Sequence, residues 1–198
     1  MNYQDYYNQN KNSLRVFCEV GVYLWSYCRL HRPIEDGKKV ILVEPLPRCI
    51  ADIRQYILGK DNVTLYPVAV AQKHGETTIY DEGASAFIQE VRGQSPCHAN
   101  GYYDFPNARQ ISEHEKIIVP TMTFDRIDPT NIDVLFVDVE GCEYFVIEKM
   151  ISRPKIICLE THYNNYKNPF AEKIQAWMDE NGYENWYKTE SDSFFLKK

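Results

Sequence analysis

Short apolar runs and helical periodicities alternate along the first third of this chain. Val16–Val20 and Lys39–Glu44 are runs of β-forming apolar residues, which predict two buried strands. Between Pro47 and Leu58 the apolar residues recur at helical spacing, and Gly59 is a natural stop, so we expect a helix there. Val63–Tyr66 predicts the next strand.

The middle of the chain loses this regularity. Thr77–Tyr80 alternates in the manner of an antiparallel strand. From Asp81 to Lys116 no periodicity is left, and glycines and prolines punctuate the segment. Loops of this length in compact domains are usually functional lids or disordered insertions, and both interpretations stay open here.

Regular structure returns in the last third. Ile132–Val137 predicts a buried strand, the apolar spacing between Tyr144 and Ile151 predicts a helix that Pro154 ends, and Lys155–Glu160 predicts another strand of the fully buried type. These elements continue the alternation of strands and helices that the first third begins.

The C-terminal part predicts a helix followed by a hairpin. Asn168 and Pro169 suit the N-cap and first position of a helix that Gly182 closes. Residues 183–189 and 193–197 predict the two strands of the hairpin. Together with the earlier alternation, this pattern favours an α/β sheet with helices on both faces.

Length and charge fit one folded domain. The 198 residues predict a single domain over residues 1–198, with 1–14 as a flexible N-terminus and 81–116 as an insertion or lid. Hydrophobic residues make up 44% and charged residues 25%, which is typical of globular proteins and not of disordered chains or membrane bundles. The net charge of −6 disfavours nucleic acid and anionic membranes as partners.

Cysteine usage and the N-terminal sequence point to a reducing compartment. Six cysteines lack CxxC or Cys/His spacing, so we expect buried free thiols and no metal site built from them. The first fifteen residues hold no apolar run of the secretory type, and no run approaches the roughly 18 apolar residues of a membrane span. A cytoplasmic protein is the expectation.

Acidic residues stand where four of the predicted strands end. Ligands of open α/β sheets bind outside the carboxyl ends of the strands, so these positions are candidates for chemistry. They are Glu19, Glu44, the pair Asp138 and Glu140, and Glu160 with His162 close behind it.

The first two of these strand ends suit a nucleoside. Gly21 lets the backbone approach a ligand closely, and Glu44 follows it at a spacing near the roughly 20 residues at which an acidic residue binds ribose hydroxyls. The loop after Gly21 is not GxGxxG, so a pyrophosphate cradle is missing and a dinucleotide is disfavoured. S-adenosylmethionine is the common ligand that has a nucleoside without phosphates.

Several stretches also resemble the FkbM-type methyltransferases, most specifically the element Asp138-Val-Glu-Gly141. The resemblance implies a Rossmann-like class I methyltransferase fold with a mostly parallel seven-stranded sheet and a C-terminal antiparallel hairpin. It also implies S-adenosylmethionine as cofactor and O-methylation of a small, often sugar-like, hydroxylated acceptor. The resembling stretches are Val43–Pro47, Asn62–Ala71, Gly75–Tyr80, Val119–Asp125, Ile132–Glu143, Ile156–Glu160 and Gly182–Tyr183.

Two positions depart from the family's usual pattern. The family usually has Asp-Val-Gly-Ala-Asn-x-Gly after the first strand, and here the loop is Glu19-Val-Gly-Val-Tyr-Leu-Trp25. Phe136 stands where members often carry a lysine. A catalytically silent binding module of the same fold is therefore the alternative to an enzyme, while an oxidoreductase is disfavoured by the missing dinucleotide motif.

The candidate site residues follow from the strand ends and the resemblance. Asp138 is expected to contact cofactor or acceptor, and direct removal of the acceptor proton is favoured over a metal mechanism because no dedicated ligand spacing exists. A homo-oligomer stays open. The cofactor candidates are Glu19, Gly21, Val22, Tyr23, Glu44, Pro45, Leu46, Val68, Ala69 and Asp138, and the catalytic candidates are Asp138, Glu140, Glu160 and His162.

Overall fold

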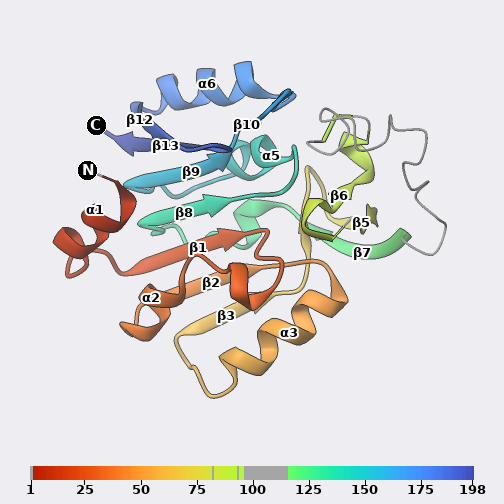
Figure 1. The fold of residues 1–198 in the computed structure, drawn as a ribbon, viewed down its shortest axis with the longest axis horizontal. Helices are drawn as coiled ribbons and strands as arrows, with labels where there is room; N and C mark the ends of the chain where they lie inside the picture. The colour runs from red at the N-terminus through yellow and green to blue at the C-terminus, as the bar shows by residue number, and fades with distance from the viewer. Residues whose placement is uncertain (1, 82, 93, 96–115) are drawn as a thin grey trace.

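A seven-stranded sheet forms the centre of the chain in a computed structural model, which describes residues 2–81, 83–92, 94–95 and 116–198 (Figure 1). The strand order is β12-β13-β9-β8-β1-β2-β3. The five strands from β9 to β3 run parallel, and β13 and β12 complete the sheet in antiparallel pairing. The strands are β1 (Val16–Val20), β2 (Lys39–Val43), β3 (Val63–Tyr66), β8 (Val134–Val137), β9 (Ile156–Glu160), β12 (Tyr183–Lys188) and β13 (Asp192–Lys197).

This arrangement confirms the predicted fold class, a mostly parallel sheet of the Rossmann-like class I type closed by a C-terminal hairpin. The predicted strands begin or end within two residues of the observed ones. The predicted antiparallel strand at 77–80 is also confirmed, but it belongs to a separate small sheet that the sequence analysis does not predict. That sheet has the order β4-β7-β5-β6 and consists of β4 (Ala69–Val70), β5 (Gly75–Tyr80), β6 (Phe87–Ile88) and β7 (Lys116–Met122).

The small sheet lies beyond the carboxyl ends of the parallel strands (Figure 1). Its β5 pairs antiparallel with both β6 and β7. The two-stranded pair β10 (His162–Tyr163) and β11 (Tyr166–Lys167) follows β9 at the same edge. The edge where strand-end chemistry was expected is therefore walled on its outer side.

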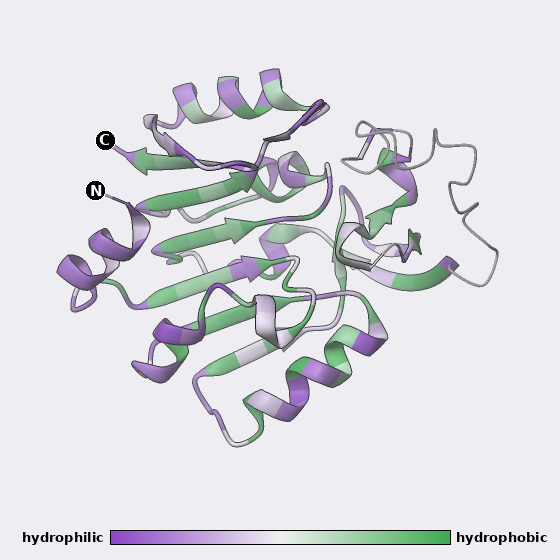
Figure 2. Cartoon of the chain, viewed as in Figure 1, coloured by the Kyte–Doolittle hydropathy of each residue, from purple (hydrophilic) through white to green (hydrophobic). Residues whose placement is uncertain are grey.

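Helices cover both faces of the main sheet because its strands are apolar on both. In β1, Cys18 packs into the core cluster that α5 and α6 cover, while Phe17 packs into the cluster that α1, α2 and α3 cover. Figure 2 shows the hydrophobic colour along the central strands and the hydrophilic colour on the outer helical turns. The α-helices are α1 (Tyr3–Asn10), α2 (His31–Glu35), α3 (Pro47–Ile57), α5 (Glu143–Glu148) and α6 (Ala171–Glu180), and the 3₁₀ helices are η1 (Trp25–Tyr27), η2 (Gly83–Ser85), η3 (Gln89–Val91) and η5 (Phe124–Arg126).

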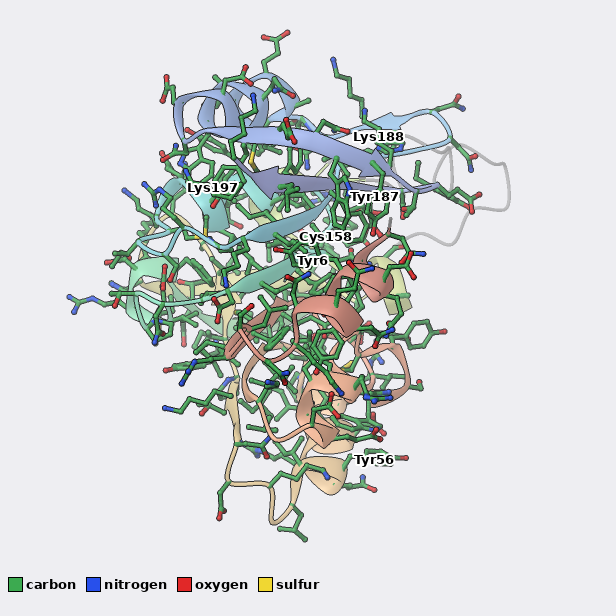
Figure 3. The ribbon with its side chains drawn as sticks, turned by 90° about the vertical axis from the view of Figure 1, so that its left-hand side faces the viewer. Tyr6, Tyr56, Cys158, Tyr187, Lys188 and Lys197 are labelled. Carbon is green, nitrogen blue, oxygen red and sulfur yellow. The ribbon has the colours of Figure 1, made fainter. Side chains whose placement is uncertain are left out.

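The N-terminal lead differs from its predicted flexible form. Residues Tyr3–Asn10 fold as α1, which begins with a capping box between Asn2 and Asp5. Tyr7 is buried, and its hydroxyl donates a hydrogen bond of 2.9 Å to Asp36. Figure 3 looks onto α1 from the amino ends of the parallel strands and shows Tyr6 beside the sheet. The buried Tyr7 and the half-buried Tyr3 and Tyr6 attach this helix, and a criterion based on apolar runs overlooks them in a polar segment.

Two helix boundaries also differ from the sequence prediction. The helix after β8 ends at Glu148, so Ile151 lies outside it and is exposed. The last helix begins at Ala171 with Phe170 as its N-cap, so Asn168 is not the capping residue. The Asn168 side chain instead accepts a hydrogen bond of 2.9 Å from the Phe170 amide.

The cysteine prediction is confirmed for the described part of the chain. Five of the six cysteines are buried free thiols, and Cys97 lies outside the described residues. Within those same residues, none of the helices combines the length and apolar character that crossing a bilayer requires. Most of the predicted 81–116 insertion, from 96 to 115, also lies outside them.

One glycine brings the ends of three strands together. The Gly21 amide donates to the carbonyl oxygen of Val43 on β2 at 2.9 Å, and Gly21 adopts φ +84°. A Cβ added at Gly21 would overlap the carbonyl oxygen of Asp138, directly after β8. The close approach of β1 to β8 therefore requires glycine at this position.

We predict that Gly21→Ala lowers the free energy of unfolding by about 3–5 kcal/mol, because left-handed backbone strain adds to a steric clash. The matched control is Gly59→Ala, which has φ +75° and nothing within 4 Å of the added Cβ, so only about 1–2 kcal/mol is expected there. Urea unfolding followed by circular dichroism measures both. Equal losses in the two variants would mean that the Gly21 contact is not tight.

Candidate active site

A cavity of about 200 Å³ opens at the carboxyl ends of β1, β2 and β8. All ten positions predicted to bind cofactor line it, and so does Glu140. The small sheet and η2, which connects its strands β5 and β6, also line the cavity through residues such as Ile79, Gly83 and Ile88. The structure thus brings together on one cavity residues that lie as far apart in the chain as Glu19 and Glu140.

Glu44 holds the first loop in place. Its carboxylate accepts hydrogen bonds from the backbone amides of Tyr23 at 2.7 Å and Leu46 at 2.9 Å. The side chain is buried, and burial raises the pKa of Glu44 to about 7 although both amides favour the ionised form. A carboxylate has about four lone-pair sites, so two are left for a ligand in the cavity.

Tyr23 takes the unusual backbone conformation of that loop. It adopts φ +60°, a region that asparagine tolerates better than tyrosine. Its ring packs edge-on against Tyr27 at a centroid distance of 5.3 Å, and the Arg48 guanidinium lies 5.0 Å from the ring centroid. Arg48 in turn forms an ion pair with Asp81. These contacts place an aromatic pair at the cavity wall.

Glu19 organises the loop that follows. Its buried carboxylate accepts hydrogen bonds from the Arg29 amide at 3.0 Å and from the Cys28 thiol at 3.2 Å. Burial raises the pKa of Glu19 to about 7, against the opposing charge of Arg29. Glu19 therefore lines the cavity and also fixes the position of the Arg29 backbone.

The Arg29 side chain connects two acidic residues at the base of the cavity. Its guanidinium lies 2.9 Å from the Asp138 carboxylate and 3.5 Å from that of Asp192, at the start of β13. It also lies 5.8 Å from the ring centroid of Phe136. Burial raises the pKa of Asp138, and the Arg29 charge opposes that rise. Arg29 thus orients Asp138 toward one side of the cavity.

The loop after β8 is held by a third buried carboxylate, Glu143. Glu143 accepts a hydrogen bond of 2.9 Å from the Val139 amide, and the Asn168 side-chain amide donates to its other oxygen. The loop between Val139 and Glu143 contains Glu140 at φ +56° and Gly141 at φ +111°. These turns direct the backbone back toward α5. Glu143 is fully buried, and that burial raises its pKa to about 7.

Three carboxylates converge behind this loop. Asp138, Glu140 and Glu160 each offer an oxygen within 4.8 Å of the other two. Asp138 and Glu140 line the cavity, while Glu160 stands behind them at the end of β9. Burial, followed by the charges of Asp138 and Glu140, raises the pKa of Glu160 to about 11.

His162 does not join this group. Its Nδ1 lies 2.8 Å from the Thr161 hydroxyl, and its Nε2 lies 3.2 Å from the Thr189 carbonyl oxygen in the loop between β12 and β13. It is not among the residues that line the cavity. The prediction that His162 converges with Asp138 and Glu160 is wrong, because β10 turns away from the sheet after Glu160.

Sequence reasoning missed the residues that hold the site. Arg29 lies in an irregular loop and Asp192 is the first residue of a hairpin strand, so neither shows a pattern that could have identified it. Glu143 belongs to the stretch 132–143 that resembles the FkbM-type methyltransferases. It follows Glu140 by three residues, a spacing that could have indicated a side chain supporting the intervening loop.

One comparison with known proteins, that with protein-family models, shows the family of this chain. Residues 10–184 match the family model described as the methyltransferase FkbM domain. No curated protein matches this chain. Among solved structures, a precorrin-6y C5,15-methyltransferase from Geobacter metallireducens GS-15 is similar over 100% of this chain and 91% of its own, with 14% identity and a TM-score of 0.43. The methyltransferase domain of bacterial CtHen1-CN is similar over 98% and 95%, with 8% identity and a TM-score of 0.46.

We predict that Arg29→Gln lowers the free energy of unfolding by roughly 2 kcal/mol, because two partly buried carboxylates lose their shared cation. Arg32→Gln is the matched control. Arg32 also pairs with an aspartate, but its side chain is 55% exposed against 29% for Arg29, so a loss below about 0.5 kcal/mol is expected. Thermal and urea unfolding measure both, and equal effects would contradict the supporting role of Arg29.

Proposed function

Because the chain belongs to the FkbM methyltransferase family, we propose that it transfers the methyl group of S-adenosylmethionine to a hydroxyl of a small, sugar-like acceptor. One observation carries the proposal. A single cavity joins Glu44, a carboxylate with lone pairs to spare, to Asp138 and Glu140 at the other strand end.

The side of the cavity near β2 and β3 suits the nucleoside. Glu44 can accept hydrogen bonds from both hydroxyls of a ribose, since its two backbone donors leave further lone pairs. Leu46, Val68 and Ala69 offer apolar surface next to it for a planar base. No side chain on this wall is a dedicated phosphate ligand, which agrees with a nucleoside that carries no phosphates.

The side near β1 and β8 suits the amino acid and sulfonium part. Gly21 has no side chain, so a ligand can approach the backbone closely there. Glu19 and Asp138 provide negative charge beside a positively charged ligand. S-adenosylmethionine supplies an activated methyl group, so the protein has to align the acceptor with it and exclude water.

The acceptor oxygen would then lie between the methyl group and the carboxylates after β8. The oxygen forms a bond to the methyl carbon while the carbon–sulfur bond breaks and its electron pair stays on sulfur. The hydroxyl proton passes to Asp138 or Glu140, which both line the cavity. Burial raises the pKa of Asp138 above the ordinary value of a carboxyl group, although the Arg29 charge opposes the rise, and a higher pKa makes the ionised form a stronger base.

A catalytically silent binding module of the same fold is the second candidate. It is favoured by Tyr23, whose positive φ and bulky ring occupy the loop position where the family usually has asparagine. The two candidates differ in one respect that can be measured. The enzyme binds S-adenosylmethionine and produces S-adenosylhomocysteine in the presence of acceptor, whereas the module gives no turnover with any hydroxylated acceptor.

We predict that Glu44→Ala weakens binding of S-adenosylhomocysteine tenfold or more, because a hydrogen bond to a charged group contributes about 1.5–3 kcal/mol. Isothermal titration calorimetry measures this affinity. The control variant is Glu76→Ala, because Glu76 on β5 is exposed. Since the pKa of Glu44 lies near 7 and its ionised form accepts the ribose hydroxyls, wild-type affinity should fall roughly tenfold between pH 8 and 5.5. Glu44→Ala should flatten this dependence. An unchanged affinity in Glu44→Ala would place the nucleoside elsewhere.

A further inference from the structure

The carboxylates of Asp138, Glu140 and Glu160 have the spacing of ligands around one ion. Their oxygens lie within 4.8 Å of one another, and Ca²⁺ binds oxygens at about 2.3–2.6 Å, so opposite ligands of one ion stand about 4.6–5.2 Å apart. Glu160 is the last residue of β9, and Asp138 and Glu140 lie in the loop that follows the neighbouring parallel strand β8, so the pairing of these two strands brings the three residues to one edge of the sheet.

A tyrosine hydroxyl points independently to a ligand at this place. Tyr166 on β11 is 2% exposed, and its hydroxyl has no hydrogen-bond partner among the described residues. That hydroxyl lies 3.5 Å from the position of a Cβ at Gly141. It is near enough to the carboxylates of Glu143, Glu160 and Glu140 for their charges to raise its pKa further, beyond the rise that burial causes. A buried donor without a partner beside carboxylates indicates that a water or ion completes the site.

Glu160 gives the same indication from the other side. The residue is 9% exposed, and its Oε2 has no hydrogen-bond partner among the described residues. Acidic side chains outnumber the cations here. Arg29 pairs with both Asp138 and Asp192, and Glu140 and Glu160 add two further carboxyl groups beside them. Asp192 stands directly opposite Glu160 across the β9–β13 pairing. Several buried carboxylates around one cation are stable only if some of them are protonated, as the raised pKa of Glu160 indicates for the site without an ion, or if a further cation binds them.

We propose that Asp138, Glu140 and Glu160 bind a divalent cation of the Mg²⁺, Mn²⁺ or Ca²⁺ type, and that an acceptor oxygen completes its coordination. The oxygen-only ligand set favours these hard ions over Zn²⁺. Asp138 and Glu140 face the cavity, so the open coordination positions point to where the acceptor lies.

The cation would lower the pKa of the bound hydroxyl and fix the oxygen toward the methyl group. The proton leaves to solvent or to a carboxylate oxygen that does not bind the cation. The oxygen then takes the methyl group, and the sulfur keeps the electron pair of the broken bond. This second half of the proposal rests on the proposed function, whereas the cation site does not.

The test is binding of Mn²⁺ to the whole chain without cofactor, measured by electron paramagnetic resonance and by calorimetry, with Ca²⁺ and Mg²⁺ as competitors. We expect saturable binding of one ion and at least tenfold weaker binding in Glu160→Gln and in Asp138→Asn. Asp192→Asn is the matched control, because it removes a neighbouring carboxylate that belongs to the Arg29 ion pair and not to the ligand group. Its affinity should change less than threefold.

A thermal readout keeps the test valid if a variant is poorly stable. Millimolar Ca²⁺ should raise the melting temperature of wild type and of Asp192→Asn, and should leave that of Glu160→Gln unchanged. Absence of saturable binding at 1 mM of all three ions would overturn the proposal, as would equal binding by wild type, Glu160→Gln and Asp138→Asn. A chain that binds S-adenosylhomocysteine but none of the three ions would refute this inference alone, and a chain that binds neither would also refute the proposed function.

Discussion

The contact between Gly21 and the carbonyl oxygen of Asp138 is the constraint on which the cavity depends. It brings the end of β1 against the end of β8, while the Gly21 amide is bonded to β2. Three parallel strands thereby end at one point, and every candidate ligand group is placed relative to it. A side chain at Gly21 would push the end of β1 away from the end of β8. The part of the cavity near Glu44 would then move away from the part near Asp138.

Buried carboxylates hold the loops that grow out of this point. Glu44, Glu19 and Glu143 each accept backbone amide hydrogen bonds from a loop that lines the cavity or adjoins it. Backbone donors stabilise a carboxylate where burial disfavours its charge, and the carboxylate in return fixes an irregular main chain. The concentration of acidic residues at this edge is therefore both the support of the site and the source of its negative field.

The strands and the cavity-facing carboxylates could be predicted because parallel strands buried on both faces read as unbroken apolar runs. Gly21, Glu44 and Asp138 stand directly at the ends of such runs, so their convergence follows from the topology. Arg29, Asp192 and Asn168 could not be found this way. Arg29 pairs with Asp138 and Asp192, and Asn168 bonds to Glu143, across long stretches of chain, and no local pattern marks such contacts. His162 was misplaced because the pair β10–β11 leaves the sheet immediately after Glu160, and α1 was missed because tyrosines rather than an aliphatic stripe attach it.

We propose that one cavity holds the cofactor across the ends of β2, β1 and β8. A crystal structure of the chain with S-adenosylhomocysteine tests this most directly. We expect the ribose hydroxyls on Glu44, the base against Leu46 and Val68, and the sulfur on the side of Asp138. A ligand bound elsewhere, or one bound in this cavity with its ribose away from Glu44, would contradict it.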